Sequence, residues 1–258
     1  MLFRSDPGDD AERTEEALRE VTLNLARVYR STGRVLEALP LLDALVAADP
    51  TSARYATWVV QMNLEAGRLE RAREALTPLL AEASVHPTLH ALEGRLLLAE
   101  NRPEEALAVF DTLRQDAQNQ PELVLDTGEA YLRMHLWDDA LSTFRHMLTI
   151  DPDSARAHHG AAKASIGLKA YAQAAESALA AVGRLYYYPE AHFHLGVAMA
   201  RLGWMDRAEQ AFQVCVTQRP GFLPAHRWLG KIYRDYLRDP ERSAHHLARA
   251  GVAPDSAA

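Results

Sequence analysis

Residues 189–220, PEAHFHLGVAMARLGWMDRAEQAFQVCVTQRP, contain the pattern that decides the fold. Apolar residues recur at helical spacing on both sides of Gly203, and glycine suits the left-handed position that often ends a helix. Pro220 closes the stretch, because proline cannot continue a second helix. Gly196 and Ala208 are small enough to let two helices approach closely. The stretch therefore predicts a hairpin of two amphipathic helices.

The same hairpin recurs along the chain with a period of 34 residues. Alanine follows this period at six positions, which are Ala38, Ala72, Ala106, Ala140, Ala174 and Ala208. On the same grid, the repeating units begin near Arg19, Ala53, Pro87, Pro121, Ala155, Pro189 and Leu223. One hairpin of this size cannot bury its own apolar face, so neighbouring units must stack to form a continuous core.

The fourth unit carries the family's residues at the expected offsets, namely Thr127-Gly128, Tyr131, Ala140, Phe144 and Pro152. This pattern resembles the tetratricopeptide repeat family, and the resemblance extends over about residues 19–250. It implies an all-α fold, a right-handed α-solenoid of about seven helical hairpins. First helices would line a concave groove and second helices a convex face.

The seventh unit departs from the period. Its turn, residues 236–240, is expected to be two residues longer than the others, so that Ala244 arrives two positions late. Residues 17–252 are predicted to form the superhelix. Residues 1–16 are expected to be a leader that is truncated or partly artefactual, and residues 253–258 a flexible tail.

Composition restricts the class of protein. The net charge of −7 argues against general nucleic-acid binding, which usually needs a basic face. No apolar run is long enough for a membrane span. The single cysteine, Cys215, allows no intrachain disulfide and favours a cytoplasmic location.

The sequence contains no recognisable catalytic motif, phosphate loop or dinucleotide fingerprint, so we expect no enzyme activity, no catalytic residue and no cofactor. Cys215 occupies a position where the repeat places a small buried residue, which favours an inert core thiol. The carboxylate pairs Glu104-Glu105 and Asp138-Asp139 begin second helices, where negative charge is favourable at the helix dipole.

Histidine is frequent, and four histidines, His90, His158, His192 and His226, occupy the fourth position of their units. Equivalent positions in adjacent helices lie roughly 8–10 Å apart, whereas metal ligands must converge at about 2 Å. Packing or groove lining is therefore favoured over a metal site. Residues 186–188 are three tyrosines, interpreted as a wedge between units or as an aromatic lip on a binding surface.

The clearest functional signal is the charge expected on the concave face of units five to seven. Six fixed positive charges there face only Glu190 and Asp235. This predicts a groove for a protein or peptide partner that is acidic or carries a free C-terminal carboxylate. The alternative is an ordinary solvated surface. The predicted groove residues are Arg156, His159, Lys163, Phe193, His194, Arg201, Arg227, Trp228, Lys231 and Arg234.

A second resemblance concerns a larger context. Residues 187–202 and 222–233 are similar to segments of bacterial proteins in which a tetratricopeptide array follows an alkaline-phosphatase-superfamily domain of the type I phosphodiesterase or sulfatase-like kind. Two functions stay open: a non-catalytic scaffold that binds a partner in its groove, or a regulatory or substrate-presenting appendage of such a metal-dependent hydrolase. None of that enzyme's metal ligands lies in this sequence, so no activity transfers to it.

Overall fold

The computed structural model describes residues 7–81, 87–117 and 120–252, and every element of secondary structure in these ranges is helical. The chain divides into two compact units, residues 1–116 and 117–258. A single superhelix over residues 17–252 therefore stays a prediction. The expected tail, residues 253–258, and the first six residues of the expected leader lie outside the described residues.

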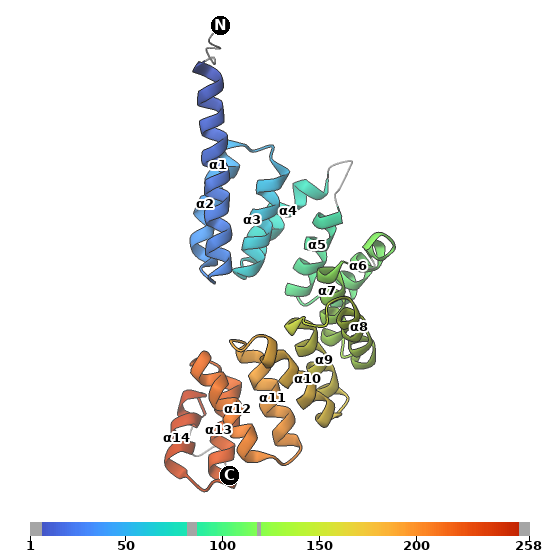
Figure 1. Cartoon of the computed structure of the whole chain (residues 1–258), viewed down its shortest axis with the longest axis vertical. Coiled ribbons are helices and arrows are strands. Elements are labelled where there is room, and N and C mark those ends of the chain that lie inside the picture. The colour runs from blue at the N-terminus through green and yellow to red at the C-terminus, as the bar shows by residue number, and fades with distance from the viewer. Residues whose placement is uncertain (1–6, 82–86, 118–119, 253–258) are drawn as a thin grey trace. The chain divides into compact units, whose positions relative to one another are not determined.

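Both units are built from antiparallel helices that pack consecutively (Figure 1). Unit 1 contains α1 (Pro7–Ser31), α2 (Val35–Ala48), α3 (Ala53–Glu65), α4 (Leu69–Leu80), α5 (Pro87–Ala99) and α6 (Pro103–Ala117). Unit 2 contains α7 (Pro121–Arg133), α8 (Trp137–Ile150), α9 (Ala155–Gly167), α10 (Tyr171–Arg184), α11 (Pro189–Arg201), α12 (Met205–Gln218), α13 (Leu223–Lys231), the π-helix η1 (Ile232–Tyr236) and α14 (Pro240–Arg249). The prediction of an all-α solenoid of helical hairpins is confirmed.

Six of the seven predicted unit starts coincide with the first residue of a helix, from Ala53 in α3 to Leu223 in α13. The unit predicted to begin near Arg19 has a longer first helix, because α1 begins at Pro7, inside the expected leader.

The turn inside each hairpin requires one left-handed residue. Gly33, Gly67 and Gly203 have φ angles of 74°, 70° and 82°, which confirms the role predicted for Gly203 at the end of a first helix and extends it to the other two. The equivalent residues of the other regular repeats are not glycine, yet Asn101, His135 and Lys169 have φ angles of 62°, 59° and 60°. The backbone geometry of the turn is thus kept even where a side chain makes it less favourable.

In three hairpins, which contain Phe110, Phe144 and Phe212, an aromatic ring of the second helix lies on a glycine of the first helix. A Cβ atom on Gly196 would lie 2.7 Å from the Phe212 ring. The Phe144 ring makes this contact twice. A Cβ atom on Gly128 would lie 2.7 Å from the ring, and a Cβ atom on Gly160 of the next repeat would lie 2.4 Å from it. These rings are almost completely buried, and the core clusters combine residues of neighbouring hairpins.

The seventh repeat corrects one prediction. Its first helix passes into the π-helix η1, which accommodates a single extra residue, and α14 begins at Pro240. Ser243, which is 4% exposed, occupies the close-packed position and donates its hydroxyl to the Gly230 carbonyl at 2.9 Å. The insertion is therefore one residue and not two, and Ala244 lies on the surface.

The glycine contacts generate a stability prediction. We expect Gly160→Ala to lower the free energy of unfolding by about 1–3 kcal/mol, because the new methyl group would overlap the Phe144 ring. Gly183, in α10, is the matched control because a Cβ atom there meets nothing within 4 Å. Gly183→Ala should stabilise by up to about 1 kcal/mol through helix propensity. Urea unfolding of both variants checks this, and equal effects would contradict the proposed packing.

Candidate functional site

The predicted groove residues lie on α9, α11, α13 and η1 of unit 2. We call the surface formed by α7, α9, α11 and α13 the first-helix face. Neighbouring helices on it are in contact, α7 with α9 and α9 with α11. Equivalent positions of adjacent repeats are consequently neighbours on this face.

Two of the predicted cations form ion pairs with the preceding repeat. Arg156 Nη1 lies 2.8 Å from Glu122 Oε2, and Lys163 Nζ lies 2.8 Å from Glu129 Oε2. Arg156 also approaches Asp126, at 3.9 Å. The sequence argument counted charges only in units five to seven, so it missed these carboxylates. When these carboxylates are counted, the positive charges of Arg156 and Lys163 are both neutralised.

The sequence contains a pattern that could have identified these two carboxylates. Glu122 and Glu129 precede their partners by 34 residues, the repeat period itself. The pair formed by Arg54 and Glu20 in unit 1 has the same separation. A charge on the first-helix face is thus paired where the preceding repeat carries the opposite charge at the same position.

His159 and His194 pack between repeats, and His194 also lines a hollow of about 450 Å³ beside Lys163. His159 Nδ1 lies 2.8 Å from the Tyr188 hydroxyl, and His159 Nε2 lies 2.9 Å from His194 Nδ1. Burial lowers the pKa of His159, lowers that of His194 to about 4 and raises the pKa of Tyr188 to about 12. All three groups are therefore uncharged near pH 7, and Tyr188 is a wedge between hairpins.

Three of the predicted cations keep their charge available. Arg201, Arg227 and Lys231 are exposed, and no carboxylate of the described residues forms an ion pair with them. The residue that precedes Lys231 by one repeat is Val197, which offers no negative charge. Arg234 differs, because its Nε lies 2.7 Å from the Asp235 carboxylate.

The two predicted aromatic residues sit at the edge of the core beside these cations. Trp228 is stacked on Phe212 with ring centroids 5.6 Å apart, and Phe193 lies 5.7 Å from the same ring. The guanidinium of Arg201 lies 5.9 Å from the Trp228 ring centroid, within cation–π range. We call Arg201, Arg227, Trp228 and Lys231 the α11–α13 basic patch.

The fourth-position histidines perform a repeated packing role. The Nε2–H of His158 donates to the carbonyl of Pro152, six residues earlier, at 3.0 Å. His192 and His226 make the same bond at 2.9 Å, to the carbonyls of Tyr186 and Pro220. Each bond ties a first helix to the linker before it. Among the residues described, no three His, Cys, Asp or Glu side chains gather as a metal ion would require.

The structure also places Tyr186, Tyr187 and Cys215, for which the sequence suggested an aromatic lip and an inert core thiol. Tyr186 and Tyr187 are 69% and 67% exposed and border a hollow of about 510 Å³ against α12. They form a lip on the second-helix side, whereas Tyr188 is a wedge. Cys215 is fully buried, and burial raises the pKa of its thiol to about 12, so it is unreactive.

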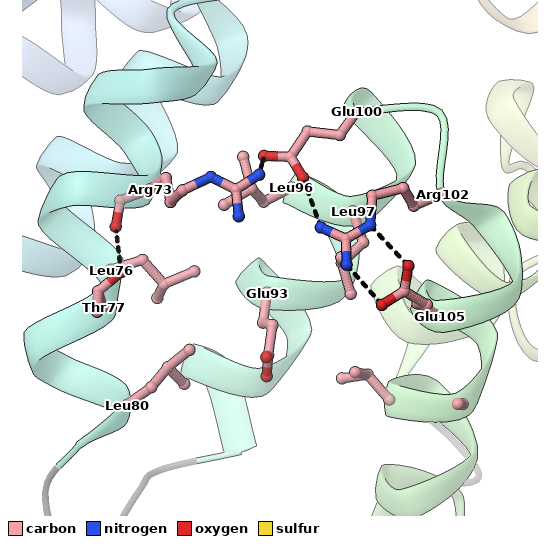
Figure 2. A pocket seen from close by; sticks show the side chains of 12 residues that line it. Arg73, Leu76, Thr77, Leu80, Glu93, Leu96, Leu97, Glu100, Arg102 and Glu105 are labelled. Carbon is pink, nitrogen blue, oxygen red and sulfur yellow. Dashed lines mark hydrogen bonds and ion pairs between the residues drawn. The ribbon is translucent and has the colours of Figure 1, made fainter.

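Unit 1 contains a hollow that the sequence did not indicate. Figure 2 shows a chain of charged groups that runs from Arg73 of α4 through Glu100 and Arg102 to Glu105 of α6. The side chain of Glu100 is only 11% exposed and is paired with both arginines. The hollow has a volume of about 430 Å³, and its apolar lining includes Leu76, Leu80, Leu96, Leu97 and Val109. Because the charges neutralise one another, we assign this network to packing between helices.

Comparisons with known families agree with this architecture. Two profiles described as tetratricopeptide repeat match the chain, one over residues 63–125 and the other over residues 11–53, 23–76 and 171–221. Together they cover more than half of the sequence. The chain belongs to the tetratricopeptide repeat family. Members of this family are generally scaffolds for protein interactions, and the tetratricopeptide array of this chain is a scaffold for protein interactions.

Individual relatives are distant. Superkiller complex protein 3 of Mus musculus is 28% identical over 145 residues, a match that covers 54% of this chain and 9% of that protein. The chain thus spans a small part of this relative. These matches give no support to the second resemblance, to the C-terminal region of phosphodiesterase- or sulfatase-like proteins.

Solved structures share the fold at low identity. A tetratricopeptide repeat protein from Parabacteroides merdae has a TM-score of 0.64 and 18% identity, covering 90% of this chain and 92% of that one. The Cut9–Hcn1 hetero-tetramer of APC/C has a TM-score of 0.74 and 15% identity, covering 96% and 51%. MamA from Desulfovibrio magneticus has a TM-score of 0.56 and 22% identity, covering 64% and 93%. In this tetratricopeptide array, no described helix is long and apolar enough to cross a membrane.

The buried histidines generate a pH prediction. His226 Nε2 donates to the Pro220 carbonyl, so its Nδ1 accepts from the Nδ1–H of His246 at 2.9 Å. Burial, with His226 and His245 nearby, lowers the pKa of His246 from 6.5 to about 4. Between these pH values the unfolded chain binds more protons, so stability is present above pH 6.5 and is lost as the pH falls, at about 1.4 kcal/mol per pH unit per histidine.

We therefore expect wild-type protein to lose about 1–2 kcal/mol more stability than His246→Phe between pH 7 and pH 5, measured by urea unfolding. His245→Phe is the control, because His245 is the exposed neighbour on the same helix. A pH dependence that is unchanged in His246→Phe would show that His246 is not held neutral.

Proposed function

We propose that the protein binds an acidic peptide segment, or the free C-terminal carboxylate of a protein partner, on the first-helix face at the α11–α13 basic patch. The observation that carries the proposal is the selective pairing of charge on this face. Arg156 and Lys163 are neutralised by the preceding repeat, whereas Arg201, Arg227 and Lys231 are not. The proposed contact is thus narrower than the ten residues predicted from the sequence.

The chemistry of the patch suits a carboxylate-bearing ligand. A guanidinium group can donate two parallel hydrogen bonds to one carboxylate, which gives geometric specificity as well as charge. Arg227 and Lys231 are four residues apart on α13 and therefore project from the same side of the helix. Trp228, partly exposed and supported by Phe212, offers an apolar surface beside them.

We further propose that the protein binds its partner without catalysing a reaction. The buried thiol of Cys215 is protonated, and the carboxylates that begin the second helices pair with neighbouring arginines or face solvent, as Glu105 does with Arg102. We also propose a cytoplasmic location, in keeping with the single buried cysteine.

The proposal predicts a charge-dependent affinity. Arg227→Glu with Lys231→Glu should raise the Kd for a fluorescent acidic peptide by about tenfold or more, because each exposed charge contributes on the order of 1 kcal/mol or less. Lys163→Glu alone should have a smaller effect, since Glu129 already neutralises Lys163. Fluorescence anisotropy at several salt concentrations measures these changes, and wild-type binding should weaken as salt rises.

The matched control keeps the net charge of the double variant but moves the change off the patch. Arg145→Glu with Lys169→Glu alters exposed residues of α8 and of the turn after α9. This control should bind like wild type. An equal loss of affinity in both double variants would show that binding depends on net charge and not on the patch, which contradicts the proposal. Retained affinity in both variants would contradict it as well.

A further inference from the structure

The second-helix side of hairpin α11–α12 contains a hollow that the proposed function does not use. Tyr186 and Tyr187, in the linker between α10 and α11, border it with exposed rings. The remaining lining residues lie on α12, between Glu209 and Gln218. The volume of about 510 Å³ is within the range of about 300–1,000 Å³ that is typical of ligand sites. We call this space, bordered by the two tyrosines and α12, the tyrosine hollow.

Several hydrogen-bond donors of this lining are already used within the protein. The Tyr187 hydroxyl donates to the carbonyl of Gln218, and the Thr217 hydroxyl donates to the carbonyl of Gln213, both at 2.8 Å. The Nε2 of Gln218 donates to the carbonyl of Tyr186 at 2.8 Å. The other atom of that amide, Oε1, is buried and accepts from no donor among the described residues. These groups therefore keep mainly acceptor capacity, which a ligand must match with donors.

Glu209 gives the tyrosine hollow a negative charge. It is the one charged side chain among the described residues that line the hollow, and no printed ion pair of these residues neutralises it. Its Oε1 accepts from the Tyr233 hydroxyl at 2.5 Å. Arg242 lies over the Tyr233 ring and attracts Glu209 at longer range, but it is paired directly with Asp239 at 3.3 Å. The carboxylate thus lies beside two exposed aromatic rings, whose faces are also negative.

We propose that the tyrosine hollow binds an arginine side chain of a second protein partner. A guanidinium group carries five donors and no acceptor, so it complements a lining that offers a carboxylate and hydroxyl oxygens. Its flat and weakly hydrated plane stacks on a tyrosine ring, whereas an ammonium group is a compact and strongly hydrated charge. A purely apolar side chain in the same space would separate Glu209 from water without giving it a partner.

This site goes beyond the proposed function, because it gives neighbouring repeats two contacts of opposite preference. The α11–α13 basic patch lies on first helices and attracts carboxylates. The tyrosine hollow lies on a second helix and the linker before its hairpin, and it attracts a cation. The two sites share no residue, so each can be occupied without the other. A scaffold with both sites would hold two different partners at once.

An NMR chemical-shift titration with a short Gly-Ser peptide that contains one arginine tests the proposal. The amide signals of Tyr186, Tyr187 and the α12 residues of the hollow should shift. A matched citrulline peptide keeps the shape of arginine without its charge, so its Kd should be about tenfold higher. A matched lysine peptide should also bind more weakly than the arginine peptide. Equal Kd values for arginine and either replacement, or shifts confined to other helices, would overturn the proposal.

Substitutions test whether the arginine peptide binds in the hollow. Tyr186→Leu with Glu209→Gln removes one ring and the charge, while the new amide can still accept from Tyr233, and the Kd should rise by about tenfold. The control, Tyr186→Phe with Glu176→Gln, keeps the ring and moves the lost charge to an exposed residue of α10 outside the hollow.

The control should bind the arginine peptide like wild type. Both double variants should bind the acidic peptide of the α11–α13 basic patch unchanged, so this proposal and the proposed function can fail separately. If the two double variants lose the same affinity for the arginine peptide, binding depends on net charge and the hollow is not the site. If neither loses affinity, the tyrosine hollow does not bind arginine.

Discussion

The close approach of two helices at a residue without a side chain is the contact on which the rest of this structure depends. Phe212 fills the space above Gly196, and its ring also supports Trp228 and Phe193 of the candidate site. Phe144 similarly joins Gly128 of its own hairpin to Gly160 of the next. Because one ring serves both the hairpin and its neighbour, the geometry of a repeat and the position of its surface residues are set together.

Stacking at a fixed period also determines which charges are available to a ligand. Equivalent positions of adjacent repeats become neighbours, so Lys163 meets Glu129, 34 residues earlier, and is neutralised. Lys231 follows Val197 at the same distance and keeps its charge. The basic strip predicted from units five to seven thus becomes a smaller patch on α11 and α13.

The histidines show how packing converts a polar residue into a structural one. At the fourth position of a repeat, His192 donates to a linker carbonyl six residues earlier, which fixes its tautomer. Deeper contacts between repeats bring His159 to His194 and His226 to His246. Burial lowers the pKa of His159, His194 and His246 and so keeps these three rings neutral. Frequent histidine in this chain therefore reflects hydrogen bonding between hairpins.

The sequence by itself determined the all-α hairpin fold, the first residue of six first helices and the left-handed turn glycines, because these follow from a local period and from backbone conformation. It could not measure the insertion before α14, where the period is interrupted. Only the tertiary structure decided that Arg156 and Lys163 are paired, that His159 is buried against His194 and that Arg201 lies beside Trp228. Pairing and burial depend on which side chains of the adjacent repeat fill the same space, and a list of positions within one repeat does not contain that information.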